Sequence, residues 1–283
     1  MHTPRTNQRK RIPTPGTARL LVPCLLVPCL LLPCLLLLSC TPQPLTVTRE
    51  PASVRLVAAD SCGPMAEALA AAYEQARPWV TVHVEVLNSA MAEQTLREGE
   101  ADLALLSWMQ ETSYEEPLWN QVFGRDGIAV IAHPSVPFDA TGLAHLQDIF
   151  RGQIQEWGGT VLVAVIREDG AGVRRVFDGT VLGIHKITHT AVVMASNEAV
   201  VEHVTRTQGA IGYVSTLRLA ESDAANVQVM PVENTLPTPD AIADGSYPLW
   251  RSLYLAGASE PTGEAREFAQ WMLGPEGQAI VKE

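Results

Sequence analysis

Hydrophobic and polar positions follow two periodicities from residue 54 onward. Short apolar or alternating runs predict strands at residues 54–59, 81–86, 102–106, 127–132, 161–166, 210–214 and 227–232. Apolar residues at helical spacing predict helices at residues 65–77, 92–98, 143–150, 197–207 and 264–273, and a short helix from residue 276. Because strands and helices alternate, we expect an α/β fold with a largely parallel sheet.

The first 39 residues have a different pattern. Five basic residues and no acidic ones precede or border an uncharged apolar run at residues 20–38. A positive segment followed by an apolar stretch is typical of an export signal. The run ends at Ser39-Cys40, which resembles the lipobox of bacterial lipoproteins. That resemblance implies removal of residues 1–39 and lipid attachment to Cys40, followed by a polar, proline-containing tether at residues 40–51.

An uncleaved transmembrane helix is the alternative for this segment, since about 20 apolar residues span a bilayer. Pro23, Pro28 and Pro33 interrupt the run at regular intervals and disfavour a continuous helix. Both interpretations place the remaining chain outside the cytoplasm, because the positive charges stay inside. We therefore expect an extracytoplasmic protein held at the cell membrane.

Composition and charge limit the possible functions of the exported part. Hydrophobic residues make up 47% of the 283 residues, which is enough for a large core. From Cys40 onward the chain has 15 basic and 31 acidic residues. This acidic balance argues against a nucleic-acid partner. Of the five cysteines, only Cys62 lies beyond Cys40, so we expect no intramolecular disulfide in the mature protein.

Small hydroxyl residues and glycines follow four of the predicted strands. Ser61 and Cys62 follow the first strand, Ser89 the second and Ser107 the third, while a loop from Arg167 to Arg174 follows a fourth. In open α/β sheets, ligands bind beyond the carboxyl ends of the strands, and helix starts there offer free N–H groups. The pattern predicts an anion site, although single turns of this kind also occur as simple helix caps.

The order of several motifs resembles the phosphate-type (PstS-like) substrate-binding proteins of bacterial ABC importers. The similarity extends over residues 54–282 and includes Leu143-x-x-Leu146-x-x-Ile149-Phe150-Arg151-Gly152, Ala210-Ile211-Gly212-Tyr213-Val214-Ser215, Gly245-x-Tyr247-Pro248-Leu249-x-Arg251-x-Leu253-Tyr254-Leu255 and Glu276-Gly277-Gln278.

The resemblance implies a two-lobed type II periplasmic-binding-protein (Venus flytrap) fold. Lobe one would comprise residues 52–131 and 234–283, and lobe two residues 132–233, with hinge crossings near residues 131–134 and 230–233. The ligand would bind between the lobes, and the closed monomer would dock on ABC permease subunits.

Transferring the family's ligand positions gives Ser61, Cys62, Ser89, Ser107, Arg167, Gly170, Ala171 and Gly172. Arg167 would supply charge, the serines hydroxyl donors, and the other residues mainly backbone N–H groups. Two positions depart from the family pattern, because Ala171 and Val173 stand where hydroxyl residues are usual. Trp108 follows Ser107 in place of a charged residue and, with Val173, would make the cleft more apolar.

Three functions follow from this pattern. The first is a binding protein for phosphate or a related oxyanion that delivers its ligand to a permease. The alternative is a surface sensor or interaction module that reuses the fold with altered or lost ligand binding. A serine hydrolase is the third, although no serine has a Gly-x-Ser-x-Gly setting. We expect no enzymatic activity, no cofactor and no metal, since His185 and His189 lack a third ligand at a suitable spacing.

Overall fold

The computed structural model describes residues 49–110, 117–137, 139, 141–221 and 226–282. The predicted signal segment, its lipidation residue Cys40 and most of the predicted tether lie outside these residues. No helix of the described part is long and apolar enough to cross a membrane.

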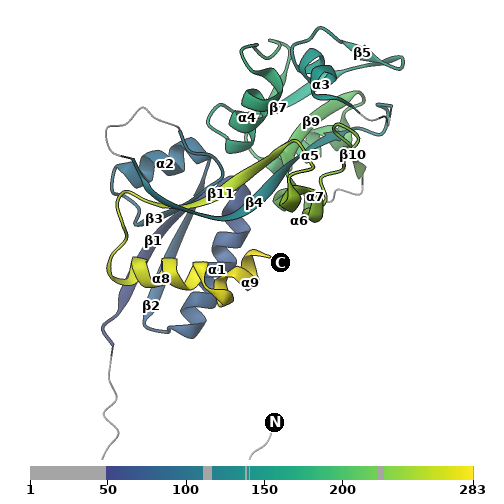
Figure 1. Cartoon of the computed structure of the whole chain (residues 1–283). Helices are drawn as coiled ribbons and strands as arrows, with labels where there is room; N and C mark the ends of the chain where they lie inside the picture. The colour runs from purple at the N-terminus through teal and green to yellow at the C-terminus, as the bar shows by residue number, and fades with distance from the viewer. Residues whose placement is uncertain (1–48, 111–116, 138, 140, 222–225, 283) are drawn as a thin grey trace, which may run out of the picture. The chain divides into compact units, whose positions relative to one another are not determined.

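The described residues alternate between strands and helices, as the sequence predicts (Figure 1). The strands are β1 (Ala52–Ala59), β2 (Val80–Leu87), β3 (Leu103–Leu106), β4 (Trp119–Ala132), β5 (Glu156–Trp157), β6 (Thr160–Val161), β7 (Val163–Arg167), β8 (Val192–Met194), β9 (Ala210–Ser215), β10 (Gln228–Met230) and β11 (Trp250–Gly257). The helices are α1 (Gly63–Ala76), α2 (Ser89–Arg97), α3 (Leu143–Phe150), α4 (Gly172–Phe177), α5 (Asn197–Arg206), α6 (Thr216–Glu221), α7 (Pro239–Asp244), α8 (Gly263–Leu273) and α9 (Pro275–Val281), with the short turns η1 (Asp60–Cys62) and η2 (Asp178–Leu182).

The main sheet is mixed rather than largely parallel. Its strand order is β2-β1-β3-β11-β4-β9-β7-β8, with β10 paired to β4. The pairs at the two ends of this order are parallel, but β11 and β4 run antiparallel to their neighbours in the middle. The sequence pattern missed this arrangement because β11 comes from the end of the chain and inserts between two earlier strands. Figure 1 shows β4 and β11 as the long pair that connects the β1–β3 half to the β7–β9 half.

Alternation along β1 determines how helices cover the first half of the sheet. Val54 and Leu56 belong to a core cluster that includes α1 and α8, whereas Val57 belongs to a second cluster with α2. Successive side chains of a strand point to opposite faces, so the second half of β1 is covered on both sides, whereas Ser53 and Arg55 in its first half are exposed.

The second half of the sheet is built in the same way. Val130 of β4 lies in the cluster that contains α3 and α4, and Ile131 lies in the cluster that contains α5. Figure 1 shows α3 and α4 in this half and α8 and α1 in the other.

The strand β4 takes part in both halves of the sheet. It pairs with β11 from Trp119 to Gly127 and with β9 from Ile128 to Ala132. Ile242, Tyr247 and Leu249 lie in the same core cluster as Val130, although they come after the second predicted crossing. The residue boundaries of the two lobes remain predictions.

Candidate functional site

Three serine hydroxyls meet at one edge of the sheet. Ser61 lies in η1 after β1, Ser89 begins α2 after β2, and Ser107 follows β3 directly. The strands β2, β1 and β3 are parallel neighbours, so their carboxyl ends bring these three segments together. All three serines are buried, and the hydroxyl oxygens of Ser89 and Ser107 are 2.9 Å apart in a hydrogen bond.

The loop between β7 and α4 closes over these hydroxyls. Gly172, the first residue of α4, lies so close that a Cβ atom there would be 2.4 Å from the Ser107 Oγ and 2.5 Å from the Ser89 Oγ. Only a residue without a side chain fits this approach. The helix has no side-chain cap, because its N-cap residue Ala171 carries only a methyl group.

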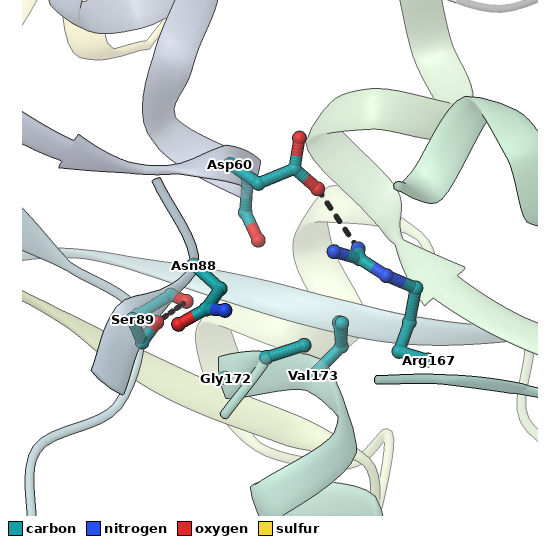
Figure 2. Close-up of a pocket in the computed structure, with 9 residues that line it drawn as sticks. Asp60, Asn88, Ser89, Arg167, Gly172 and Val173 are labelled. Atoms are coloured by element: carbon teal, nitrogen blue, oxygen red, sulfur yellow. Dashed lines mark hydrogen bonds and ion pairs between the residues drawn. The ribbon is translucent and has the colours of Figure 1, made fainter. Parts of the chain in front are cut away.

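These segments meet at a tightly closed pocket that leaves essentially no space for a water molecule. Figure 2 shows Ser89 and Asn88 on one side of it and Gly172, Val173 and Arg167 on the other. The lining residues are Asp60, Ser61, Asn88, Ser89, Ser107, Arg167, Ala171, Gly172 and Val173.

Arg167 is the charged residue that the sequence predicts for this site, and it is held by two carboxylates. Its Nη1 lies 2.8 Å from Asp60 Oδ2, and its Nε lies 2.9 Å from Glu168 Oε2. The Nη2 atom donates to the other oxygen of Glu168 and to the carbonyl of Ala195. Figure 2 shows Arg167 reaching toward Asp60 across the pocket. Arg167 is 1% exposed, and the carboxylates of Asp60 and Glu168 compensate its positive charge inside the protein.

A second guanidinium, which the sequence reasoning did not assign to the site, contacts two of the serines. Arg251 of β11 donates from Nη2 to the Ser61 Oγ at 2.7 Å and from Nη1 to the Ser107 Oγ at 3.1 Å. It also pairs with the buried carboxylate of Asp126 on β4, at 2.6 Å between Nη2 and Oδ2. The only sequence signal was its place inside the motif that carries the family resemblance.

A chain of hydrogen bonds links this ion pair back to Asp60. Asp126 accepts from the hydroxyl of Ser215 at 2.9 Å, and the Ser215 N–H donates to Asn197. Asn197 in turn donates from Nδ2 to Asp60 Oδ2 at 2.5 Å. Asp60 therefore receives donors from both Arg167 and Asn197.

Two of the eight predicted ligand residues do not line the pocket. Cys62 is fully buried, and burial raises the pKa of its thiol to about 12. Gly170 adopts a φ of +101°, which favours glycine, and its carbonyl accepts a hydrogen bond from the N–H of Ala90. The ring of Trp108 packs against the guanidinium of Arg175, and Trp108 is not among the residues that line the pocket. Within the described residues, no group of three or more His, Cys, Asp or Glu side chains gathers as a metal site would require.

Comparison with known proteins identifies the family. Residues 46–276 match the family model described as a PBP superfamily domain. The phosphate-binding protein PstS 2 of Streptococcus pneumoniae is 29% identical over 136 residues, which cover 45% of each protein. The chain thus spans about half the length of the curated relatives it matches.

Two solved structures share the fold. A Clostridium perfringens protein described as a phosphate ABC transporter substrate-binding protein, solved with bound phosphate, is 27% identical with a TM-score of 0.73, covering 81% of this chain and 96% of that one. The regulatory domain of CcmR from Synechocystis, solved in complex with 2-PG, has a TM-score of 0.60 at 19% identity, covering 78% and 96%. The chain therefore belongs to the PBP superfamily, as a PstS-like type II periplasmic binding protein with the two-lobed fold.

Proposed function

We propose that the protein is an extracytoplasmic substrate-binding protein of an ABC importer, which binds phosphate or a related oxyanion between its lobes. The observation that carries this proposal is the convergence of Ser61, Ser89 and Ser107 on one buried pocket with Arg167. Oxyanions need several hydrogen-bond donors, and each buried polar group left without a partner costs about 1–3 kcal/mol. Hydroxyl and guanidinium donors brought together from distant segments meet that need.

Binding requires a rearrangement at Arg167. Asp60 occupies one edge of the guanidinium, and the Asp60 side chain is 22% exposed while that of Arg167 is 1% exposed. An arriving oxyanion would take the place of Asp60 on Arg167 and accept from the serine hydroxyls. The loop that begins at Gly170 would have to move away from the serines, since Gly172 contacts them directly.

Lobe closure around the ligand is part of this proposal. Contacts such as Asp60 with Arg167 and the Ala90 N–H with the Gly170 carbonyl join the two sides of the pocket. Ligand-driven hinge closure requires higher affinity for the closed form, and a bridging oxyanion would provide it. The closed monomer would then present its surface to ABC permease subunits.

Calorimetric titration with phosphate, sulfate, molybdate and a neutral sugar tests the binding proposal. We expect heat with at least one anion and none with the sugar. Ser107→Ala should weaken that binding at least about tenfold, because one buried donor is lost. The matched variant Ser259→Ala, at an exposed position two residues after the end of β11 and outside the residues that line the pocket, should bind as the unchanged protein does. The absence of heat with every anion would contradict the transport function.

We also propose that Cys40 carries the lipid anchor, as its lipobox context suggests. Intact-mass measurement of the protein extracted from membranes should give a chain that starts at an acylated Cys40. A mass that includes residues 1–39 would instead support an uncleaved membrane segment. Cys40→Ser should release the protein from the membrane fraction or leave it unprocessed.

A surface sensor or interaction module is the second candidate. Ala171 and Val173 offer methyl groups where a phosphate site would gain from hydroxyls, and both guanidiniums near the serines already have carboxylate partners. Affinity capture from detergent-solubilised membranes distinguishes the two functions. Permease subunits would support transport, whereas other membrane or surface proteins would support the sensor.

A further inference from the structure

A second hollow opens beside the serine pocket. It has a volume of about 300 Å³ and shares Asp60, Asn88 and Arg167 with the serine pocket. Its remaining lining residues are Val86, Leu87, Glu168 and Ala195. The two hollows are therefore neighbouring parts of one cleft, joined at the Asp60–Arg167 ion pair.

The wall of this hollow is apolar on one side. Val86 lies near the end of β2 and is 41% exposed, and Leu87 and Ala195 contribute further apolar surface. Covering apolar surface is favourable by about 25 cal/mol for each Å² removed from water. This wall suits a short hydrocarbon segment rather than a bare inorganic ion.

The charges in the hollow point to the rest of the ligand. Asp60 and Glu168 together carry two negative charges, and Arg167 carries one positive charge. An oxyanion that takes the place of Asp60 on Arg167 leaves the Asp60 carboxylate close to a second anion. Like charges at short range repel, whereas an ammonium group placed beside Asp60 would restore the balance.

From these observations we propose that the cleft takes a zwitterionic organophosphorus compound, a phosphonate or phosphate monoester with a short chain that ends in an ammonium group. The oxyanion would lie against Arg167 and the serines, the chain against Val86, and the ammonium beside Asp60 and Glu168. This inference rests on the proposed oxyanion-binding function and specifies the ligand class for the same cleft.

Calorimetric titration of the processed protein with four probes tests the inference. The probes are inorganic phosphate, 2-aminoethylphosphonate, propylphosphonate, whose chain ends in an uncharged methyl group, and phosphonoacetate, whose chain ends in a carboxylate. We expect 2-aminoethylphosphonate to bind at least about tenfold more tightly than propylphosphonate, and phosphonoacetate to bind most weakly, because the chain end is positive in the first, uncharged in the second and negative in the third. Equal binding of the amine and the acid would overturn the inference.

Two variants and one control test whether Asp60 and Val86 cause the preference for 2-aminoethylphosphonate. Asp60→Asn should remove the preference for the amine over propylphosphonate while phosphate still binds. Val86→Trp should fill the hollow and abolish binding of both chain-bearing phosphonates without changing phosphate binding. Val161→Trp, at a valine that is 68% exposed on β6, is the matched control and should bind like the unchanged protein. A thermal melt of each variant confirms that it folds.

The outcomes separate this inference from the proposed function. Heat with inorganic phosphate and none with the amine leaves the oxyanion function in place and overturns the zwitterion inference. Heat with none of the four probes overturns the zwitterion inference, and the oxyanion function is overturned as well only if sulfate and molybdate also give no heat. If both Asp60→Asn and Val86→Trp still bind 2-aminoethylphosphonate more tightly than propylphosphonate, the ammonium lies elsewhere and the zwitterion inference is overturned.

Discussion

Arg251 and Asp126 lie directly opposite each other in the pairing of β11 with β4 and form a buried ion pair, with Nη2 2.6 Å from Oδ2. Both side chains are almost completely buried, at 2% and 0% exposed. The same guanidinium holds Ser61 and Ser107 by hydrogen bonds. The ion pair thus connects the long central strands to the hydroxyls of the serine pocket.

Replacing Arg251 by glutamine should lower the free energy of unfolding by about 3–5 kcal/mol, because Asp126 would be left as a buried charge without its partner. Urea unfolding followed by circular dichroism measures this change. Arg251→Gln combined with Asp126→Asn should recover part of the loss, since no uncompensated charge then remains buried.

An exposed arginine provides the control for this experiment. Arg266 lies 4.0 Å from Glu260, and both side chains are more than half exposed. Arg266→Gln should change the free energy of unfolding by less than about 1 kcal/mol. Similar losses for the two arginines would show that the Arg251–Asp126 pair contributes no more than a surface contact.

Gly172→Ala should destabilise the protein by about 1–3 kcal/mol, because its methyl group would overlap the hydroxyl oxygens of Ser89 and Ser107. Gly179 is the matched position, since a Cβ there meets no atom within 4 Å. Gly179→Ala should be neutral or stabilise by about 0.4–1 kcal/mol through the lower entropy of the unfolded chain. Chemical denaturation compares the two variants, and an equal effect of both would refute the close contact at Gly172.

The thiol of Cys62 should resist alkylation in the folded protein. Burial raises its pKa to about 12, so at pH 8 on the order of one molecule in 10,000 carries the reactive thiolate. Iodoacetamide labelling, followed by mass spectrometry of the peptide that contains Cys62, should show little label without urea and full label in urea. Comparable labelling rates in both conditions would contradict the buried position.

Asp178 should make stability depend on pH. Burial raises the pKa of its carboxyl above the ordinary value of 3.8, despite the opposing hydrogen bond from Arg174, and its Oδ1 has no hydrogen-bond partner. A raised carboxyl pKa means that folding disfavours the charged form. The unchanged protein should therefore gain stability relative to Asp178→Asn as pH falls from neutrality through this raised pKa, and the gain should be complete below 3.8.

Urea unfolding at several pH values in this range measures the difference between the two proteins. Asp240→Asn, which removes an exposed carboxylate at the start of α7, is the control for the loss of one negative charge. A difference between Asp178→Asn and the unchanged protein that stays constant with pH, or grows in the opposite direction, would contradict the prediction.

The sequence allowed the serine side of the pocket to be predicted because that side depends on local order. Ser61, Ser89 and Ser107 each follow a strand, and parallel neighbouring strands end at the same edge. The helix at residues 143–150 was predicted with its observed bounds for the same local reason, since its apolar residues repeat at helical spacing.

Arg251 could not be placed from local pattern. Its partner Asp126 lies 125 residues earlier in the chain, and only the antiparallel pairing of β11 with β4 brings them together. The pairing of Arg167 with Asp60 is also a long-range contact, over 107 residues. Which charged residues meet at such separations depends on how the strands pair. In the middle of the sheet the pairs are antiparallel, whereas the alternation of strands and helices predicted a largely parallel sheet.

Arg251 and Asp126 belong to paired strands, whereas Arg167, Gly172 and the serines lie at strand ends, in a turn or at helix starts, so the guanidinium that holds Ser61 and Ser107 comes from the scaffold itself. Exchange of the 168–173 loop would therefore change one wall of the serine pocket and leave that guanidinium in place. For the proposed oxyanion receptor, this separation offers a starting framework for laboratory evolution toward other small anions.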